Sequence, residues 1–534
     1  MKRFAFLFAA LSGAVLLWAA WPVSPLTFLV FIAWLPLLWV EDNIQRIGKF
    51  FAAAYLHMLT WNLAVTWWVW NASLAGALSA FLANSLVMCV PWLLFYVIKR
   101  NLGRRVGYIS LVAFWISFEF IHHNWELSWP WLTLGNAFAT HPEWVQWYSF
   151  TGSTGGTLWI LVSNIIAYSL FVEYRNNGKT KIYYRKLYFF VALLIIPILL
   201  SRFVLLPSQH SDNGNETAAE KNVVVVQPNI DPYNEKFTGS VEEQIQKLII
   251  LSEKQMDRNT SLVVWPETAV PVSANEADIK SNIFYNPVWS FLNRHPFVSL
   301  LTGINSYKVY GKDKKLASET ARFDEQSGIY YDEFNTAAFF QADSSVQFYH
   351  KAKLVPGVET LPSFLGFMGK WFEDLGGISG TLGRDRQRKI FTAWDHHFKA
   401  APIICYESIY SDYITAYVRN GANILTVITN DGWWGNTPGY KQHMNYARLR
   451  AIETRRWIAR SANTGISCFI DPRGNIINAQ PWDTASSIKL PVPVREEQTF
   501  FVRYGDLLSR IMAGAAALLL VINLVYWIKS KWNQ

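Results

Sequence analysis

The sequence contains very little cysteine, with only Cys89, Cys405 and Cys468 in 534 residues. Three thiols cannot build a disulfide framework, and no two of them fall at the spacing of metal ligands. The count therefore excludes a small disulfide-stapled fold, and we expect neither a metal nor another cofactor. It leaves open that one of the three cysteines has a chemical role.

The chain also lacks a basic stripe interleaved with base-stacking aromatic residues. A net charge of +9 would otherwise suggest a nucleic-acid partner. Many of the cations instead flank apolar runs, which is typical of cytoplasmic loops of membrane proteins. These cations are Lys2 and Arg3, Arg46 and Lys49, those of residues 99–105 and 175–186, and Lys529 with Lys531. We expect no nucleic-acid partner.

Apolar residues are unevenly distributed along the chain. Long apolar runs dominate before residue 207 and after residue 507, whereas the stretch between them has the composition of a soluble domain. Eight runs approach the length that a bilayer requires, and we expect membrane helices at 4–21, 25–40, 51–70, 73–98, 107–122, 152–173, 187–205 and 508–528. The expected domains are therefore seven helices in 1–207, a domain outside the membrane in 221–500, and an eighth helix with a tail in 507–534.

The basic loops also predict an orientation. If the N-terminus is cytoplasmic, the loops after the second, fourth and sixth helices are cytoplasmic too, and these loops carry the cations. The loop at 122–150 has no Lys or Arg and falls on the other side. Seven crossings then deliver the central domain outside the cytoplasm, and the eighth returns Lys529 and Lys531 to it.

The central domain reads as an α/β sandwich after a polar linker at 208–220. Short β-branched or apolar runs alternate with helical stretches at 241–256 and 443–459. The runs are residues 222–227, 261–265, 298–304, 336–341, 401–405 and 424–429. Two excursions stand out, a polar hairpin or flap at 307–332 and a segment at 362–382 whose Gly and aromatic content predicts an apolar lid.

Three of the predicted strands end in reactive side chains, Glu267, Lys351 and Cys405. A thiol needs a base to become a nucleophile, which a carboxylate supplies, and a nearby cation offsets the repulsion between the two anions. The cation can also stabilise an oxyanion. Taken singly, the cysteine could be a small core residue, the glutamate a turn cap and the lysine a solvated charge. The ordered trio in one domain favours chemistry.

In the order Glu, Lys, Cys, this trio resembles the nitrilase superfamily, whose members form an αββα sandwich and carry acyl groups on the cysteine. Joined to membrane helices, the chain resembles the membrane-embedded branch of that superfamily, the apolipoprotein N-acyltransferases. The resemblance spans nearly the full length. The matching segments are 349–351, 354–356, 405–407, 430–431 with Trp433 and Gly435, 442–443, 447–453, 460–465, 471–474 and 503–506.

The resemblance implies a role for each site residue. Glu267 would be the general base, Lys351 the oxyanion stabiliser and Cys405 the nucleophile, with Glu359, Tyr406 and Glu407 in support. An acyl chain would pass from a phospholipid, by resemblance phosphatidylethanolamine, through a cysteine thioester to the α-amine of the diacylglyceryl-cysteine of apolipoproteins. The location implied is the bacterial inner membrane, with the catalytic domain facing the periplasm and both termini cytoplasmic.

Some positions depart from the family pattern. Gly357-Val358 replaces Phe-Gly, Gly432 begins a motif that usually opens with Ala, and Pro228 replaces a glycine. These changes leave the lid geometry and the acyl-chain preference open. One alternative is a membrane-tethered hydrolase of the nitrilase or amidase type, against which eight helices argue, since one would suffice as an anchor. Another is a transporter or receptor with an inert outer domain.

Two features of the helical part each allow two interpretations. Glu119 is an isolated acid in an apolar run, and it is either a functional group or a polar tie between helices. Tryptophans near the outer interface either form an anchoring belt or line an entrance for acyl chains. These tryptophans are Trp125, Trp129, Trp131, Trp144 and Trp147. His122, His123 and His443 lack partners at ligand spacing, so structural hydrogen bonds are expected for them.

Overall fold

The computed structural model describes residues 2–205, 220–361, 363–368 and 380–532. The expected linker at 208–220, except its last residue, lies outside the described residues, as does most of the expected lid at 362–382. The chain divides into two compact units. The first comprises residues 1–69, 76–206 and 504–534, and the second comprises residues 70–75 and 207–503.

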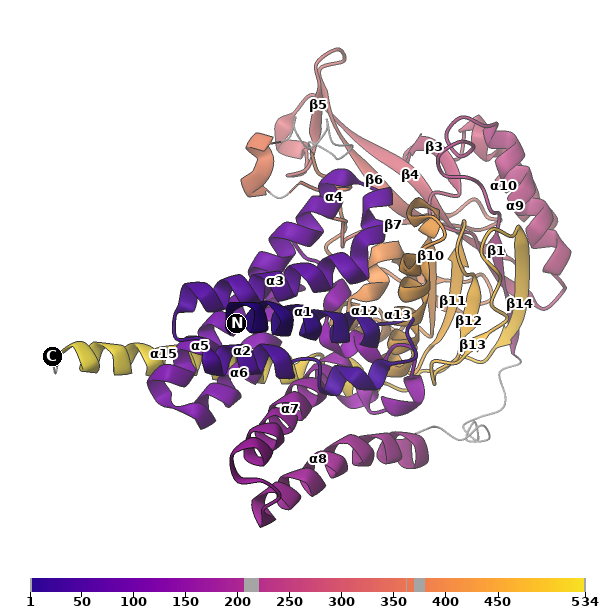
Figure 1. Cartoon of the computed structure of the whole chain (residues 1–534). Helices are drawn as coiled ribbons and strands as arrows, with labels where there is room; N and C mark the ends of the chain where they lie inside the picture. The colour runs from indigo at the N-terminus through magenta and orange to yellow at the C-terminus, as the bar shows by residue number, and fades with distance from the viewer. Residues whose placement is uncertain (1, 206–219, 362, 369–379, 533–534) are drawn as a thin grey trace. The chain divides into compact units, whose positions relative to one another are not determined.

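The first unit is helical (Figure 1). Its α-helices are α1 (Lys2–Ala20), α2 (Leu35–Asn43), α3 (Ile47–Thr66), α5 (Asn84–Leu102), α6 (Arg104–His122), α7 (Tyr148–Asn177), α8 (Lys181–Leu200) and α15 (Leu507–Trp532). The short α4 (Leu74–Leu78) runs through a π-helical turn into α5. Within the described residues, four helical segments are long and apolar enough to cross a membrane. They are Gly76–Leu102, Tyr148–Asn177, Lys181–Leu205 and Leu507–Trp532.

The helix expected at 25–40 is broken, and that prediction was wrong. A 3-10 turn at Thr27–Phe31 is followed by α2, in which Pro36 occupies the first turn. Proline lacks an N–H and is favoured where a helix begins, so it starts a new helix rather than continuing one. Asn164 of α7 satisfies backbone groups at the break: its Oδ1 accepts from Trp34 N and its Nδ2 donates to Val30 O, both at 2.8 Å. Such pairing lets an interrupted helix persist among apolar neighbours.

The second unit contains two β-sheets. The first has the order β14-β1-β2-β4-β6-β5, with β3 paired to β4 and β7 to β6; the second has the order β13-β12-β11-β10-β9-β8. The strands of the first sheet are β1 (Lys221–Gln227), β2 (Thr260–Val264), β3 (Val270–Asn275), β4 (Ser299–Gly311), β5 (Arg322–Asp324), β6 (Ile329–Phe340), β7 (Val346–His350) and β14 (Ser486–Val492). Those of the second are β8 (Phe391–Thr392), β9 (Lys399–Ile404), β10 (Ile424–Thr429), β11 (Trp457–Ala462), β12 (Cys468–Ile470) and β13 (Ile476–Ile477).

Helices cover the outer faces of the two sheets (Figure 1). Helix α9 (Val241–Gln255) begins at Ser240, whose side chain accepts from Glu243 N, and its apolar face joins the core with β1 and β2. Helix α10 (Asn286–Arg294) packs on α9, while α12 (Ser411–Arg419) and α13 (Pro438–Thr454) pack on the second sheet. Strands β1, β2 and β10 are buried almost throughout, as expected for strands covered on both faces. The layers are α-β-β-α.

The register of parallel strands positions the site. Strands β1, β2 and β4 run parallel in the first sheet, and β9, β10 and β11 run parallel in the second. The carboxyl ends of parallel strands meet at one edge of a sheet, where functional side chains gather. The expected helix at 443–459 is wrong only over 455–459, because α13 ends at Thr454 and β11 follows. The polar segment at 307–332 is a hairpin, as expected, built from the ends of β4 and β6 with β5 beside them.

Candidate active site

Glu267 lies in a loop that leaves the end of β2. Backbone hydrogen bonds fasten this loop to β4: Gly303 N donates to Pro266 O at 3.0 Å, and Ala269 N donates to Gly303 O at 2.7 Å. The loop lies so close that a Cβ on Gly303 would fall 2.5 Å from Glu267 Cα. Glycine is thus required at this point of β4, because any side chain would displace Glu267.

Lys351 and Cys405 each follow a strand directly. Lys351 comes after β7, and its backbone N donates to Asn335 O of β6 at 2.9 Å. Cys405 comes after β9 and has a left-handed backbone with φ of 48°, a conformation that costs energy for a residue with a side chain and that gathers at functional sites. Glu267, Lys351 and Cys405 are all buried.

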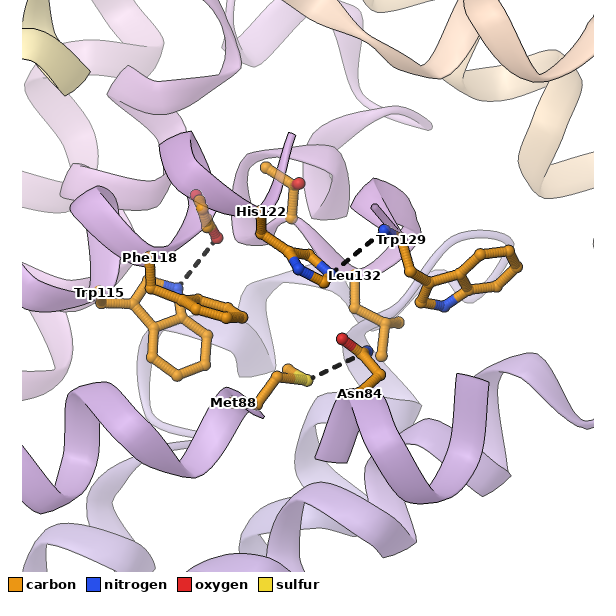
Figure 2. Close-up of a pocket in the computed structure, with 9 residues that line it drawn as sticks. Asn84, Met88, Trp115, Phe118, His122, Trp129 and Leu132 are labelled. Carbon is orange, nitrogen blue, oxygen red and sulfur yellow. Dashed lines mark hydrogen bonds between the residues drawn. The ribbon is translucent and has the colours of Figure 1, made fainter. Parts of the chain in front are cut away.

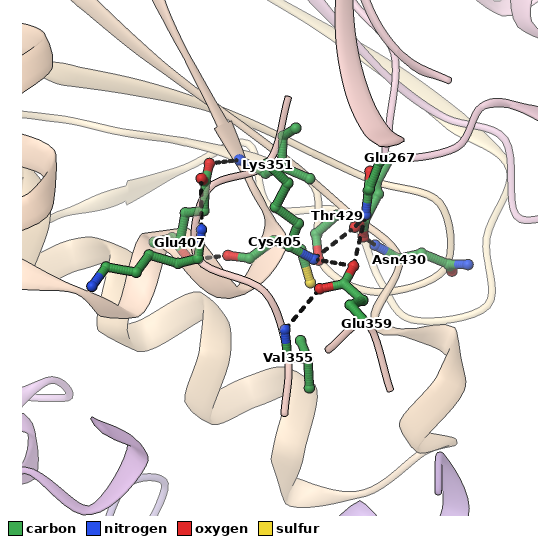
Figure 3. Close-up of polar contacts among 12 residues, drawn as sticks. Glu267, Lys351, Val355, Glu359, Cys405, Glu407, Thr429 and Asn430 are labelled. Atoms are coloured by element: carbon green, nitrogen blue, oxygen red, sulfur yellow. Dashed lines mark hydrogen bonds and ion pairs between the residues drawn. The ribbon is translucent and has the colours of Figure 1, made fainter. Parts of the chain in front are cut away.

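The functional groups of these three residues and of Glu359 converge (Figure 3). Lys351 Nζ lies 3.3 Å from Glu267 Oε1 and 2.8 Å from Glu359 Oε1. Asn335 Nδ2 donates to the same two oxygens at 2.8 and 2.9 Å, and Asn430 N donates to Glu267 Oε2 at 3.1 Å. Figure 3 shows the Cys405 sulfur beside the end of Lys351. A carboxylate, an ammonium and a thiol thus share one small buried volume.

The electrostatics differ for the three groups. Burial raises the pKa of Glu267, but Lys351 and the Asn335 amide outweigh burial, so that pKa lies below its usual value. Burial likewise opposes the charge on Lys351, but Glu359 and Glu267 raise its pKa above the usual value. For Cys405, burial and Glu267 raise the pKa well above its usual value despite Lys351. At rest the site therefore holds a carboxylate, an ammonium and a protonated thiol, with the proton acceptor already in place.

Glu407 joins two of the segments that carry the site. Its Oε1 accepts from Tyr349 Oη at 2.6 Å, from Tyr413 Oη at 2.6 Å and from Ala352 N at 2.8 Å. Its Oε2 accepts from Ile404 N at 2.9 Å. The side chain is buried, and its contacts fix the backbone beside Lys351 against the backbone beside Cys405. Tyr406 is buried next to it, with its ring edge-on to Tyr410 at 5.3 Å.

A second buried network of hydrogen bonds reaches the backbone of Cys405. Asp431 Oδ1 lies 2.8 Å from His443 Nδ1, and Arg460 Nη2 donates to Asp431 Oδ2 at 2.7 Å. His443 Nε2 lies 3.1 Å from Cys405 O, and Ser408 Oγ donates to the same carbonyl at 2.7 Å. His443 therefore makes structural hydrogen bonds. Among the residues that the structure describes, no group of three His, Cys, Asp or Glu is arranged to hold a metal ion.

The structure brings Glu267, Lys351, Cys405 and Glu359 together, and it adds residues that sequence reasoning missed. Asn335 lies within β6, one position before the run expected as a strand at 336–341, and it gave no signal of its own. Lys236 lies in a polar turn after β1 and is 2% exposed, although lysines in such turns are normally solvated. Their burial beside Glu267 depends on long-range packing, which neither spacing nor composition reveals.

In the helical unit, Glu119 ties several segments together. It accepts from Trp115 Nε1 at 2.9 Å, from Leu134 N at 2.9 Å and from Thr157 Oγ1 at 2.7 Å, which fits the interpretation as a polar tie. It also borders a small pocket (Figure 2). Of the five expected interfacial tryptophans, Trp131 is buried, with its ring 4.7 Å from that of Trp68. The pocket is lined by Asn84, Met88, Trp115, Phe118, Glu119, His122, Trp129, Leu132 and Thr133.

Comparisons with known proteins cover both units. Residues 222–494 match the family described as carbon-nitrogen hydrolase, which confirms the expected nitrilase-like domain, and residues 13–166 match the apolipoprotein N-acyltransferase N-terminal domain. The apolipoprotein N-acyltransferase of Chlorobaculum tepidum is 32% identical over 530 residues, which is 97% of this chain and 96% of that protein. That of Geobacter metallireducens is 27% identical over 531 residues, 96% of this chain and 94% of that protein.

Among solved structures, Nit3 of Saccharomyces cerevisiae, described as a member of branch 10 of the nitrilase superfamily, matches 52% of this chain and 91% of its own length. Its sequence identity is 16% and its TM-score is 0.36.

Proposed function

Since the chain belongs to the apolipoprotein N-acyltransferase family and is an acyltransferase that acts on lipoproteins, we propose that Cys405 carries the acyl group as a thioester. The observation that carries this proposal is the contact of Lys351 Nζ with Glu267 at 3.3 Å and with Glu359 at 2.8 Å, beside the Cys405 sulfur. A base, a cation and a thiol in one buried volume are the parts that acyl transfer through cysteine needs.

The first half-reaction forms the acyl-enzyme. Cys405 Sγ attacks the ester carbonyl carbon of a phospholipid while Glu267 takes the thiol proton. Two of the three N–H groups of Lys351 bond to carboxylates within the described part of the chain, so the third is available to the oxyanion of the tetrahedral intermediate. When the intermediate collapses, the ester C–O bond breaks and Glu267 returns its proton to the leaving glycerol oxygen. The products are a thioester and a lysophospholipid.

The second half-reaction transfers the acyl chain to the lipoprotein. The α-amine of the N-terminal diacylglyceryl-cysteine attacks the thioester carbon, and Glu267 takes a proton from the amine. The C–S bond then breaks, the sulfur regains a proton from Glu267, and an amide forms. Both half-reactions use the same base and the same oxyanion site, as expected of a ping-pong transferase.

A membrane phospholipid suits the donor role, and phosphatidylethanolamine is the one proposed. Donor and acceptor both carry acyl chains whose burial is worth about 0.8 kcal/mol per CH₂. Neither substrate therefore leaves the bilayer readily, so the enzyme has to work where the bilayer is. The apolar helices of the first unit serve that need.

We further propose that the helical unit crosses the bacterial inner membrane eight times, with both termini cytoplasmic and the catalytic unit in the periplasm. Support comes from α8 and α15, in which only 6% of the most apolar stretch is buried inside the protein. Such a surface requires an apolar surrounding. The cations at 99–105 and 175–186 lie where α5 meets α6 and where α7 meets α8. This topology places both junctions on the cytoplasmic side, in line with the distribution of Lys and Arg in membrane proteins.

The acyl-enzyme can be observed directly. Purified full-length protein is incubated with phosphatidylethanolamine without acceptor, and the peptide that contains Cys405 is analysed by mass spectrometry. We expect a mass increment of one acyl chain on Cys405, which is absent in Glu267→Gln because that variant lacks the base. Cys468→Ser is the matched control, since Cys468 is buried in β12, and it should keep the adduct.

Addition of a diacylated lipopeptide then identifies the acceptor. We expect loss of the adduct and appearance of N-acylated peptide. Release of free fatty acid without N-acylated peptide would instead identify a hydrolase, and an unmodified Cys405 would remove the thioester mechanism.

A further inference from the structure

Lys236 is a buried cation that the mechanism above does not use. It is 2% exposed in a turn between β1 and α9, and its Nζ donates to the backbone O of Glu267 at 3.2 Å. When the Asn430 side-chain amide is oriented to satisfy its other contacts, Nζ also donates to the Asn430 side-chain oxygen at 3.2 Å. Within the described residues no carboxylate lies at ion-pair distance from Lys236. An ammonium buried in this way needs a reason.

The charges around Glu267 supply that reason. Glu267 and Glu359 both contact the one ammonium of Lys351. Two carboxylates that share a single cation in a buried site repel each other, and one of them tends to hold a proton. Asp431, whose charge also acts on Cys405, is already paired with Arg460 at 2.7 Å. With Cys405 a neutral thiol, the group formed by Glu267, Glu359 and Lys351 carries a net charge of −1. Adding Lys236 brings the net charge of this group to zero.

We propose that Lys236 is a positioning residue that keeps Glu267 in its carboxylate form between turnovers, ready to accept the thiol proton. The proposal rests on the role assigned to Glu267 above. The ammonium acts through the Glu267 backbone carbonyl and through its field, and it touches neither the sulfur nor the ester. Moving the proton from Cys405 to Glu267 leaves the total charge of the group at zero, so the activated state is as well balanced as the resting one.

The other groups that face Glu267 do not replace this charge. Lys351 contacts it from the segment after β7 and Asn335 from β6, while the Asn430 backbone N–H approaches from the segment after β10. Lys351 also binds Glu359, and Asn335 and Asn430 offer only dipoles. Lys236 itself is strained by its surroundings, since burial lowers its pKa to about 8 while Glu267 opposes that fall. It nonetheless carries its charge at neutral pH.

The test measures how the reactivity of Cys405 depends on pH, with neither lipid nor acceptor present. Full-length protein is alkylated with iodoacetamide over a range of pH, and the modified Cys405 peptide is quantified. Glu267 must be ionised to activate the thiol, so the alkylation rate falls on the acid side. In Lys236→Met the acid limb should move to higher pH by about one unit, the size of a nearby-charge effect. At pH values well above the limb the rate should approach that of the unchanged protein.

Two variants separate charge from shape. Lys236→Arg keeps the charge and should keep the acid limb in place. Lys247→Met removes another lysine that reaches a backbone carbonyl, Asn229 O at 3.4 Å, but not Glu267, and it should leave the limb unchanged. An acid limb of Lys236→Met that coincides with that of the unchanged protein overturns the proposal.

If neither Lys236 variant folds, the proposal can still be tested on the unchanged protein. The infrared difference between it and Glu267→Gln reports a protonated carboxyl group, and such a band at neutral pH would also overturn the proposal. Its absence there supports it. Because alkylation and infrared absorption require no acyl transfer, failure of the thioester experiment would leave this result intact, and the two proposals can fail separately.

Discussion

At the scale of single residues, Asp431 shows how a buried acid can stabilise the nucleophile without touching it. It binds His443 and Arg460, and His443 reaches the carbonyl of Cys405. Burial alone would raise the pKa of Asp431, but Arg460 and His443 outweigh it and lower that pKa to about 2. The ion pair therefore fixes His443, and the hydrogen bond from His443 to the Cys405 carbonyl stabilises the left-handed backbone at Cys405.

The lowered pKa of Asp431 gives a pH-dependent prediction. A carboxyl group whose pKa falls on folding adds stability that is fully present above its unfolded pKa, near 3.9, and lost as pH falls through its folded pKa. At neutral pH Asp431→Asn should lower the free energy of unfolding by about 3–5 kcal/mol, because Arg460 is left buried without its anion. The difference between the two proteins should shrink as pH falls toward 2, which thermal unfolding in detergent can follow.

Asp313→Asn is the matched control for this experiment. Asp313 is exposed and caps a short turn by accepting from Lys315 N at 2.9 Å, a role that asparagine fills equally well. We expect no change in the free energy of unfolding. Equal stability of Asp431→Asn and the unchanged protein at neutral pH would refute the role given to the ion pair.

The residue scale also marks how far the sequence could predict the site. Glu267, Lys351 and Cys405 were each expected at the end of a strand, and the structure brings their side chains together. Their catalytic roles stay a prediction. Lys236 and Asn335 were not predictable, because a polar turn and a polar residue inside a strand have many ordinary explanations. Only the folded contacts distinguish them.

At the scale of elements, β4 determines where the Glu267 loop lies. A Cβ on Gly303 would fall 2.5 Å from both Glu267 Cα and Thr268 N, which is closer than atoms can approach. Gly303→Ala should therefore push the loop away from Lys351 and reduce acyl transfer by roughly 100-fold, since displacements of about 1 Å in a catalytic group have effects of that size. N-acylation of a diacylated lipopeptide measures the loss.

Gly514→Ala in α15 provides the comparison, because nothing lies within 4 Å of the added Cβ. We expect nearly unchanged acylation from this variant. Full activity in Gly303→Ala would mean that the loop yields without moving Glu267, and that the close packing on β4 has no catalytic value.

Two errors at the element scale have physical causes. The helix expected at 25–40 was predicted because residues on both sides of Pro36 are equally apolar. Proline instead begins a new helix there, which apolar content alone does not reveal. The expected helix at 443–459 ran too far because α13 ends at Thr454, and Arg455, which follows it, has a left-handed backbone with φ of 51°. Glycine usually marks such an ending, and arginine gives no sign of it. Buried β-branched strands such as β1 and β10 were predictable from composition alone.

At the scale of the whole molecule, the eight-crossing topology predicts which loops face outward. Single cysteines are introduced at Asn124, in the loop between α6 and α7, and at Asn176, near the end of α7; both positions are exposed. In spheroplasts a membrane-impermeant maleimide should label the cysteine at position 124, and it should label that at position 176 only after permeabilisation. Cys405 is replaced by Ser in both variants because its thiol is the one expected to react, and Cys89 and Cys468 are buried, so background labelling should be low.

The reverse pattern of labelling would invert the orientation, and equal labelling at both positions would rule out the one crossing proposed between them, that of α7. The division of the chain into a helical part and an α/β part was apparent from composition, since the two parts are built for different solvents. The number of crossings is harder to predict, because only four helical segments among the described residues are long and apolar enough on their own.

The protonated state of Cys405 also bears on the durability of the enzyme. Peroxides and disulfides attack the thiolate form of cysteine far more readily than the thiol. In the periplasmic location proposed above, no reducing thiol pool would repair an oxidised sulfur. By withholding ionisation until an ester arrives, the surroundings of Cys405 shield the sulfur from oxidants while it waits, so the same feature that delays its chemistry extends its working life.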